Sequence, residues 1–269
     1  MRKIIFFDFD NTLYCHKTKQ VPPSALRALG SLRKEGHFLA LATGRGMESL
    51  TMINTKTDFV FDAYILLNGQ VVIEQGSVVF ERYIDLQDSS ALFLQADSLG
   101  VAYGGYTEIG QAVNTRNDQV DAVWHDFGAT VPPVIPEFRS IKRKYLLQLY
   151  ISENQEGDFA HHVSGYVTNR THRYMISMIP QEAGKSIGIS YILRKHKFTQ
   201  GQAIAFGDGY NDVDMLQSVG CGVAMEDGDP KLLAIADRIS PAAEHDGIER
   251  TLSALGLLAD TAKSSPSLK

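Results

Sequence analysis

Short apolar runs typical of buried strands alternate with amphipathic stretches typical of helices at the start of the chain. The run at residues 4–7 contains only Ile and Phe, and similar runs follow at 38–42 and 63–67. Helices are expected between them, at 23–35 and around 47–53. A strand that is apolar throughout is buried on both faces, and strands that alternate with helices build a parallel sheet covered by helices. The sequence therefore predicts an α/β fold.

The pattern changes between residues 84 and 179, where strands follow one another with little regular alternation. We expect strands at 101–106, 111–114, 145–151 and 172–179, and helices at 89–99 and 158–163. Such a mixture is typical of an α+β unit. Alternation then resumes, with a strand at 222–225 and helices at 230–236 and 247–257. We therefore expect a discontinuous core domain, residues 1–83 and 180–269, with an inserted α+β domain at 84–179.

Two acidic residues, Asp8 and Asp10, follow the first apolar run. Ligands of open α/β sheets bind outside the carboxyl ends of the strands, so this is a candidate site. Side chains alternate along a strand, and Asp8 and Asp10 can therefore point the same way while Phe9 points the other way. The alternative is a simple polar turn, because Asp and Asn favour turns.

Four motifs in order make the polar turn the weaker explanation. They are Asp8-Phe9-Asp10-Asn11-Thr12-Leu13, Thr43-Gly44-Arg45, Gly184-Lys185-Ser186 and Gly207-Asp208-Gly209-Tyr210-Asn211-Asp212. Each alone is weak, since a Gly-Asp-Gly indicates only a turn and an isolated Lys is usually solvated. Together they resemble the haloacid dehalogenase-like (HAD) phosphohydrolases, Cof-type subfamily IIB, sugar phosphatase-like proteins with a C2b cap. This resemblance covers nearly the whole chain and implies a Rossmann-like core with the insertion as its cap.

The resemblance implies an Mg²⁺-dependent phosphatase that acts through an aspartyl-phosphate. Asp8 would be the nucleophile and Asp10 the general acid and base, roles that suit paired carboxylates. Lys185 and Thr43 would stabilise the phosphoryl oxygens. Mg²⁺ prefers a few carboxylates together with water and substrate oxygens. The implied ligands are Asp8, the main-chain carbonyl of Asp10, and Asp208, with Asp212 in support.

Further residues are candidates for binding the phosphate or the substrate. Gly44 and Arg45 follow the second strand, and Asn211 lies in the acidic fourth motif. An ion pair with a neighbouring acid is the alternative for Arg45. Asn68-Gly69 is expected beside the substrate in the Cof-type branch, but Asn-Gly also marks a tight hairpin turn, and the two interpretations have equal support.

Departures from the family pattern remove none of the catalytic groups. Asn11 stands where Gly is commoner, a mild change because Asn tolerates unusual backbone angles. Glu226-Asp227-Gly228 replaces the usual Gly-Asn-Ala, and acid facing the site would disfavour highly anionic substrates. His16 follows the nucleophile loop, where a lone His is expected to be solvated.

The resemblance implies a small phosphorylated metabolite as the partner, and the composition is consistent with it. The formal charge of −5 gives no basic footprint for nucleic acid, and the run of basic residues at 139–144 is expected to be a solvated face. No apolar run is long enough for a membrane span. The two cysteines form no disulfide framework, so the expected compartment is the cytoplasm. Two other functions stay open: a phosphotransferase such as a phosphohexomutase, and a ligand sensor without turnover.

Overall fold

The protein, as a computed structural model that describes residues 1–84 and 86–258, divides into two compact units. The core unit comprises Met1–Glu81 and the chain from Gly184 onward, and the insert unit comprises Arg82–Ala183. The chain passes between the two units after Glu81 and after Ala183. The boundaries expected from the sequence were after residues 83 and 179. Each unit has its own sheet and its own apolar core.

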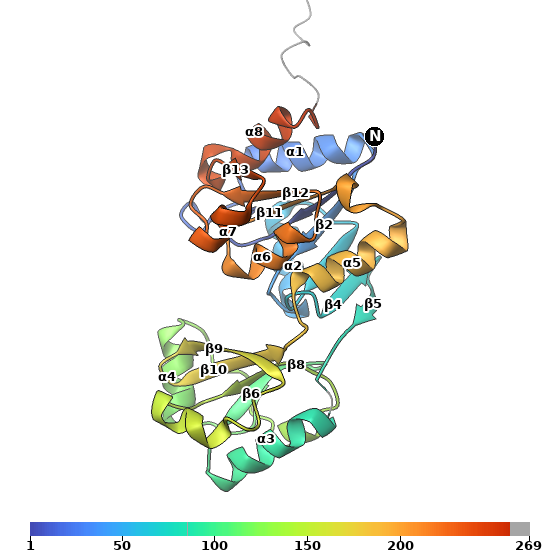
Figure 1. The fold of residues 1–269 in the computed structure, drawn as a ribbon. Coiled ribbons are helices and arrows are strands. Elements are labelled where there is room, and N and C mark those ends of the chain that lie inside the picture. Colours follow the sequence, from blue (N-terminus) through green and yellow to red (C-terminus); the bar gives the residue numbers. More distant parts are fainter. Residues whose placement is uncertain (85, 259–269) are drawn as a thin grey trace, which may run out of the picture. The chain divides into compact units, whose positions relative to one another are not determined.

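The core unit is built on an eight-stranded sheet in the order β13-β12-β11-β1-β2-β3-β4-β5 (Figure 1). Its strands are β1 Ile4–Phe7, β2 Phe38–Ala42, β3 Ala63–Leu66, β4 Val71–Glu74, β5 Ser77–Glu81, β11 Ala203–Gly207, β12 Cys221–Met225 and β13 Arg238–Ser240. The strands from β13 to β3 run parallel to one another, whereas β4 and β5 are joined to the sheet by antiparallel pairing. The predicted α/β class is confirmed.

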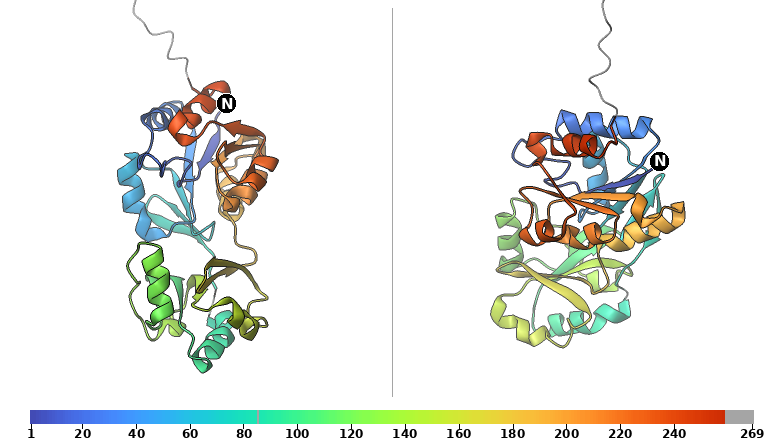
Figure 2. Two further views of the ribbon diagram at one scale, coloured as in Figure 1. Left: turned by 90° about the vertical axis from the view of Figure 1, so that its left-hand side faces the viewer. Right: turned by 45° about the horizontal axis from the view of Figure 1, so that its top comes forward.

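Helices lie on both faces of this sheet (Figure 2). They are α1 Pro23–Lys34, η1 Met47–Ser49, α2 Leu50–Thr57, α5 Lys185–His196, η4 Gln200–Gln202, η5 Tyr210–Asp212, α6 Val213–Gln217, α7 Pro230–Ile235, η6 Ala243–His245 and α8 Gly247–Ala254. Alternate residues of β1 point to opposite faces, so Ile4 and Phe6 pack with Ile189 of α5 and Met215 of α6.

The insert unit contains a five-stranded antiparallel sheet in the order β7-β6-β8-β10-β9. Its elements are α3 Leu86–Ser98, β6 Tyr103–Thr107, β7 Gly110–Val113, α4 Asp118–Asp126, η2 Phe138–Ser140, β8 Lys144–Leu149, η3 Glu153–Phe159, β9 Tyr166–His172 and β10 Met175–Pro180. Across residues 1–84 and 86–258, every helix is too short or too polar to cross a membrane.

The expectations for the insert unit were only partly met. The strand expected at 172–179 is β10, which begins at Met175, whereas β9 before it was not predicted; β9 is a largely exposed edge strand and shows no apolar alternation. The helix expected at 158–163 is instead the 3₁₀ segment η3, which starts earlier because Ser152 and Gln155 form a capping box. Helix α4 was missed, although its N-cap Asn117 accepts a hydrogen bond from the Val120 amide.

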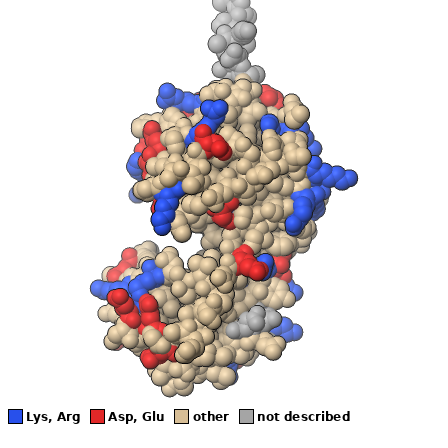
Figure 3. Space-filling view, viewed as in Figure 1, with Lys and Arg blue, Asp and Glu red and all other residues tan. Residues whose placement is uncertain are grey.

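The basic run at 139–144 is only partly solvated. Lys144 is fully buried, and its Nζ donates to the main-chain oxygens of Arg139, at 3.1 Å, and Ile141. Arg139 pairs with Asp97 and Arg143 with Glu108. On the face that Figure 3 shows, acidic and basic side chains of the insert unit lie beside one another. The run is therefore an internally paired segment of this unit.

Glycine at position 188 is required for the close packing of α5 on the sheet, which gives a test of the core. An added Cβ would lie 2.5 Å from Cγ2 of Ile65, whereas at Gly30 in α1 it would meet nothing within 4 Å. We expect Gly188→Ala to lower the free energy of unfolding by about 1–3 kcal/mol, as overpacking does. Gly30→Ala should raise it by up to about 1 kcal/mol through helix propensity. Urea unfolding of both variants checks this, and equal effects would contradict the packing.

Candidate active site

Two acidic side chains stand side by side where the central strands of the core end. Strands β1 and β11 are parallel neighbours, with Phe7 in register with Phe206, and the Asp8 amide donates to the Phe206 carbonyl at 2.9 Å. Asp8 follows β1 and Asp208 follows β11, so the register of these strands places both carboxyl groups at one edge of the sheet. Asp212 of η5 joins them, and one carboxylate oxygen from each residue lies within 4.8 Å of the others.

A buried ammonium group lies against two of these carboxylates. Nζ of Lys185, the first residue of α5, donates to Oδ1 of Asp8 and to Oδ1 of Asp212, each at 2.5 Å. The Lys185 side chain is completely buried. A buried charge is tolerated only when it is paired and hydrogen-bonded, and Lys185 meets that condition. The motif of α5 is therefore joined to two motifs that are far away in the sequence.

Asp212 also holds the loop that carries Asp208. Its Oδ2 accepts hydrogen bonds from the amides of Asp208, at 3.0 Å, and Gly209, at 2.9 Å. A Cβ on Gly207 would lie 2.6 Å from the Asp212 side chain, so glycine is required there. Because both Asp212 oxygens already have donors, this residue acts mainly as a support for the loop.

Crowding of acidic groups shifts their protonation. Burial raises the pKa of Asp8 well above its ordinary value; the Lys185 ammonium opposes the rise, while Asp212 and Asp208 add to it. Burial and the Asp212 charge raise the pKa of Asp208 to about 6, against a hydrogen bond donated by Thr12 at 3.1 Å. Burial alone would lower the pKa of Lys185, but Asp212 and Asp8 more than offset it and raise that pKa. The carboxylates outnumber the ammonium group, so this cluster favours a bound cation.

The Asp10 carboxylate has different partners from Asp8. Its Oδ2 accepts from Nε of Arg45, and its Oδ1 accepts from Nη2 of Arg45 and interacts with Nε2 of His16, all at 2.7 Å. Burial would raise the pKa of Asp10, but these two partners outweigh burial and lower it. Arg45 thus forms the ion pair that was the alternative for it. His16 is exposed, as expected, but it also contacts the Asp10 carboxylate. Neighbouring Asn11 adopts the left-handed region, φ 54°, which explains why Asn can stand there.

The remaining candidates line one polar row beside these groups. Thr43 is buried at the end of β2, and its Oγ1 accepts from the Arg45 amide at 3.2 Å. The Asn68 amide donates to the Thr43 carbonyl, and the Asn68 side chain accepts from Nδ2 of Asn211 at 3.1 Å. A Cβ on Gly44 would lie 3.2 Å from Oδ1 of Asn68. The row brings the second motif, the Asn-Gly turn and the fourth motif together.

Asn68-Gly69 forms the turn of the β3–β4 hairpin, with φ of 52° and 91°. The hairpin turn also places Asn68 in the polar row, beside Thr43 and Asn211.

The acidic departure at 226–227 does not add free charge to the cluster. Glu226 accepts from the Ala242 amide at 2.9 Å, and Asp227 pairs with Lys17 at 3.2 Å. Lys17 also pairs with Glu244. Both acids are therefore engaged by the loop after β1 and by the segment near η6.

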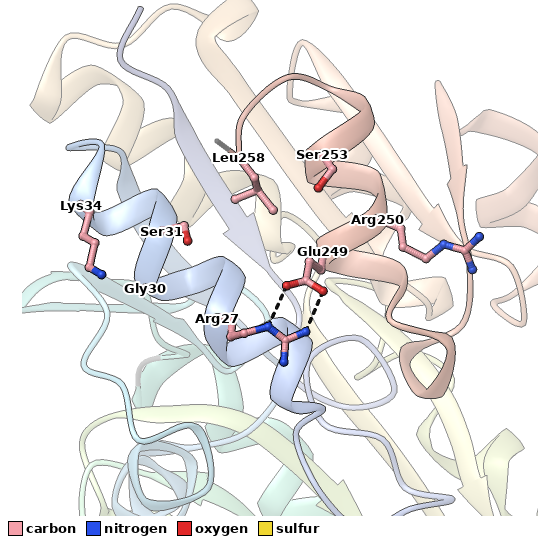
Figure 4. Close-up of a pocket in the computed structure, with 8 residues that line it drawn as sticks. All are labelled: Arg27, Gly30, Ser31, Lys34, Glu249, Arg250, Ser253 and Leu258. Carbon is pink, nitrogen blue, oxygen red and sulfur yellow. Dashed lines mark hydrogen bonds and ion pairs between the residues drawn. The ribbon is translucent and has the colours of Figure 1, made fainter. Parts of the chain in front are cut away.

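A large hollow of about 910 Å³ lies elsewhere, between α1 and α8 (Figure 4). Its lining residues are Arg27, Gly30, Ser31, Lys34, Glu249, Arg250, Ser253 and Leu258. Arg27 forms a bidentate ion pair with Glu249 across this hollow. None of the candidate site residues lines this hollow. The candidate site is therefore the cluster of charged side chains at the strand ends, and this hollow is separate from it.

Sequence reasoning assigned no role to three side chains that the structure places at the site. Thr12 binds Asp208, His16 contacts Asp10, and Asp214 accepts a hydrogen bond from the Ser186 amide beside Lys185. Thr12 lies within the first motif and could have been proposed from it. Asp214 carries no signal in the sequence, because its partner Ser186 comes from a distant segment. His16 lies only six residues after its partner Asp10, so its nearness to the first motif was the available signal.

Comparisons with known proteins agree on one family. Residues 5–252 match the family of haloacid dehalogenase-like hydrolases. The chain is 29% identical to "Putative phosphatase YkrA" of Bacillus subtilis (strain 168), over 95% of this chain and 98% of that protein. The solved structure of the HAD phosphatase BT1666 from Bacteroides thetaiotaomicron is 27% identical, with a TM-score of 0.84 over 96% of each chain.

A structure described as the HAD subclass IIB sugar phosphatase BT4131 is 25% identical, with a TM-score of 0.78 over 95% of this chain and 100% of that one. Sequence, fold and site geometry thus converge with the family match, which spans both parts of the core unit and the insert unit. The chain belongs to the haloacid dehalogenase-like hydrolase family and is a phosphomonoesterase of that family.

Proposed function

We propose that the protein is an Mg²⁺-dependent phosphatase of small phosphorylated metabolites, with sugar phosphates as its preferred class and an aspartyl-phosphate as its intermediate. The observation that carries the proposal is the cluster of Asp8, Asp208 and Asp212, in which Asp8 and Asp212 hold the buried Lys185 ammonium. Phosphoryl transfer needs an oriented nucleophile and neutralised charge. This cluster orients Asp8, and its excess of carboxylates would hold the cation that neutralises the charge.

The donor set suits a hard divalent cation. All side-chain donors are oxygens, and carboxylates exceed the single ammonium in number. Asp8, Asp208 and the main-chain carbonyl of Asp10 would hold the ion, and Asp212 would support them through the loop amides. When bound, Mg²⁺ would reduce repulsion between the Asp8 carboxylate and the phosphoryl oxygens.

In the first step, a carboxylate oxygen of Asp8 attacks phosphorus and the bond from phosphorus to the ester oxygen breaks. Asp10 gives its proton to the departing alkoxide, so the products are an aspartyl-phosphate and an alcohol. Lys185 and the Thr43 hydroxyl stabilise the charge on the phosphoryl oxygens. Lys185 already touches the nucleophile, at 2.5 Å, and can serve both groups.

In the second step, Asp10 takes a proton from water, the water oxygen bonds to phosphorus, and the Asp8 carboxylate leaves. Inorganic phosphate departs and Asp10 is protonated again. The pair with Arg45 lowers the pKa of Asp10, which opposes its role as an acid. An anionic substrate would compete for Arg45 and loosen that pair, which would raise the pKa of Asp10 and let it hold the proton that it donates to the leaving group.

Gly44, Arg45, Asn68, Gly69 and Asn211 are proposed to bind phosphate or substrate. The polar row supports this proposal, since its amide groups and hydroxyl lie beside the proposed nucleophile's strand. The sugar phosphate class is supported by the likeness to BT4131, a sugar phosphatase of subclass IIB. The cytoplasm is the proposed compartment, because Cys15 and Cys221 are both free thiols, as in a reducing environment.

Phosphate release from a panel of sugar phosphates, nucleotides and an aryl phosphate tests the proposal. With Mg²⁺ we expect turnover that is highest on a sugar phosphate, and EDTA should abolish it. Asp8→Asn keeps the size of the side chain but loses its nucleophilic charge, so its rate should fall by at least about 10³-fold, the scale of losing a covalent nucleophile.

The control is Asp62→Asn. The Asp62 carboxylate belongs to the core unit and accepts a hydrogen bond from the Leu39 amide, at 2.8 Å, outside the candidate site. This variant should leave turnover unchanged. Full activity of Asp8→Asn, or activity that EDTA does not reduce, would contradict the proposal. Appearance of a second phosphorylated sugar in place of phosphate would identify a phosphotransferase.

Cation affinity should depend on pH through Asp208. Its pKa of about 6 means that the carboxylate is free for Mg²⁺ above that pH and protonated below it. Binding should therefore weaken below pH 6, and the dissociation constant should rise by at least about tenfold for each pH unit, the slope for one competing proton. Protonation of Asp8, whose pKa is also raised, would steepen this slope. Calorimetric titration with Mg²⁺ across this range measures the effect.

Thr12→Val removes the hydrogen bond that opposes the rise in the pKa of Asp208. This variant should move the pH at which Mg²⁺ affinity begins to fall to a higher value. An affinity that stays constant from pH 5 to pH 7 would contradict this assignment of the shift.

A further inference from the structure

Lys185 lies immediately after the point where the chain returns to the core unit, so its position is sensitive to movement of the preceding linker. The chain passes from the insert unit back into the core unit between Ala183 and Gly184, so Lys185 is only the second residue after the crossing. Its ammonium must stay between Asp8 and Asp212, each at 2.5 Å. Any displacement of the linker would pull directly on the start of α5. Something must therefore fix this helix end to the core.

Helix α5 does not provide its own N-cap. Its N-cap residue is Gly184, which has no side chain to bind the first amides of the helix. Asp214, the second residue of α6, takes that place: its Oδ2 accepts from the Ser186 amide at 2.8 Å. A carboxylate at a helix start is favourable both as a hydrogen-bond acceptor and toward the helix dipole.

The same segment is held from the other side by the Asn-Gly turn. A Cβ on Gly69 would lie 1.9 Å from the Gly184 carbonyl oxygen, and a Cβ on Gly184 would lie 2.3 Å from Oδ2 of Asp214. Gly184 is therefore packed between the hairpin turn on one side and the Asp214 carboxylate on the other. A larger residue at Gly69 would displace the backbone just before Lys185, and one at Gly184 would displace the Asp214 carboxylate.

We propose that Asp214 is a positioning residue that caps α5 from a neighbouring helix and holds Lys185 in place against the linker. Asp212 and Asp214, two residues apart, bind the side chain of Lys185 and the backbone of Ser186. One short segment of α6 and η5 thus fixes both the ammonium and the helix that carries it. The functional part of this inference rests on the proposed role of Lys185 in phosphoryl transfer.

Two substitutions at Asp214, with a matched control, separate positioning from general stability. Asp214→Ala removes the cap, and we expect kcat to fall by about 10- to 100-fold with little change in KM, the scale of a misplaced catalytic group. Asp214→Asn keeps an oxygen that can accept the Ser186 hydrogen bond and should retain most of kcat. Asp62→Ala loses a carboxylate–amide bond of the same length, 2.8 Å, at the amino end of β3, and should leave kcat unchanged.

Amide hydrogen exchange gives a readout that does not need turnover. Asp214→Ala should speed exchange in a peptide spanning residues 184–190, whereas Asp62→Ala should leave that peptide unchanged. Thermal melting of all variants shows that each is folded. Unchanged exchange in Asp214→Ala, or a kcat no lower than that of Asp62→Ala, would overturn the inference. If the wild type turns over no phosphomonoester, the proposed function fails, and exchange alone then decides whether Asp214 holds the helix.

Discussion

The structure depends on one buried interaction, the Lys185 ammonium between the carboxylates of Asp8 and Asp212. A buried ammonium is costly unless its partners are well placed, and removing a single partner from such a group costs about 3–5 kcal/mol. The three residues come from the end of β1, the start of α5 and the segment η5. The contact therefore fixes the relative positions of three elements that the sequence separates widely, and it does so where the central strands end.

Two acidic residues from the end of one strand have opposite environments. Asp8 is buried among other carboxylates, and its pKa is raised; Asp10 faces Arg45 and His16, and its pKa is lowered. Pairs of titratable groups whose surroundings push their pKa values apart are typical of acid–base sites. The carboxylates around Asp8 favour binding of a cation. The Arg45 side chain beside Asp10 favours binding of an anion, which would compete with Asp10 for Arg45. A phosphate ester bound with Mg²⁺ supplies both.

Sequence reasoning predicted the core well because its signals are local. The apolar strands, their order of alternation with helices, and the motif residues at strand ends all follow from nearby residues. It failed in the insert unit, where β9 is an exposed edge strand without apolar alternation and η3 starts at a capping box. It also could not assign a role to Asp214, because its partner Ser186 comes close only through the fold. His16 was left without a role although its partner Asp10 is only six residues away. The pairing of Asp10 with Arg45, weighed only as an alternative, depends on the same long-range geometry.

The most direct test of the account is to trap the covalent intermediate. Protein in the presence of Mg²⁺ and an aryl phosphate would be quenched in acid, digested and analysed by mass spectrometry. Asp10→Ala is included because an aryl oxide leaves without help from an acid, whereas hydrolysis of the intermediate still needs the base. The account predicts one phosphoryl group, sensitive to hydroxylamine, on the peptide that contains Asp8, and more of it in Asp10→Ala. Steady phosphate release with no phosphorylated peptide, or a phosphoryl group on another residue, would contradict it.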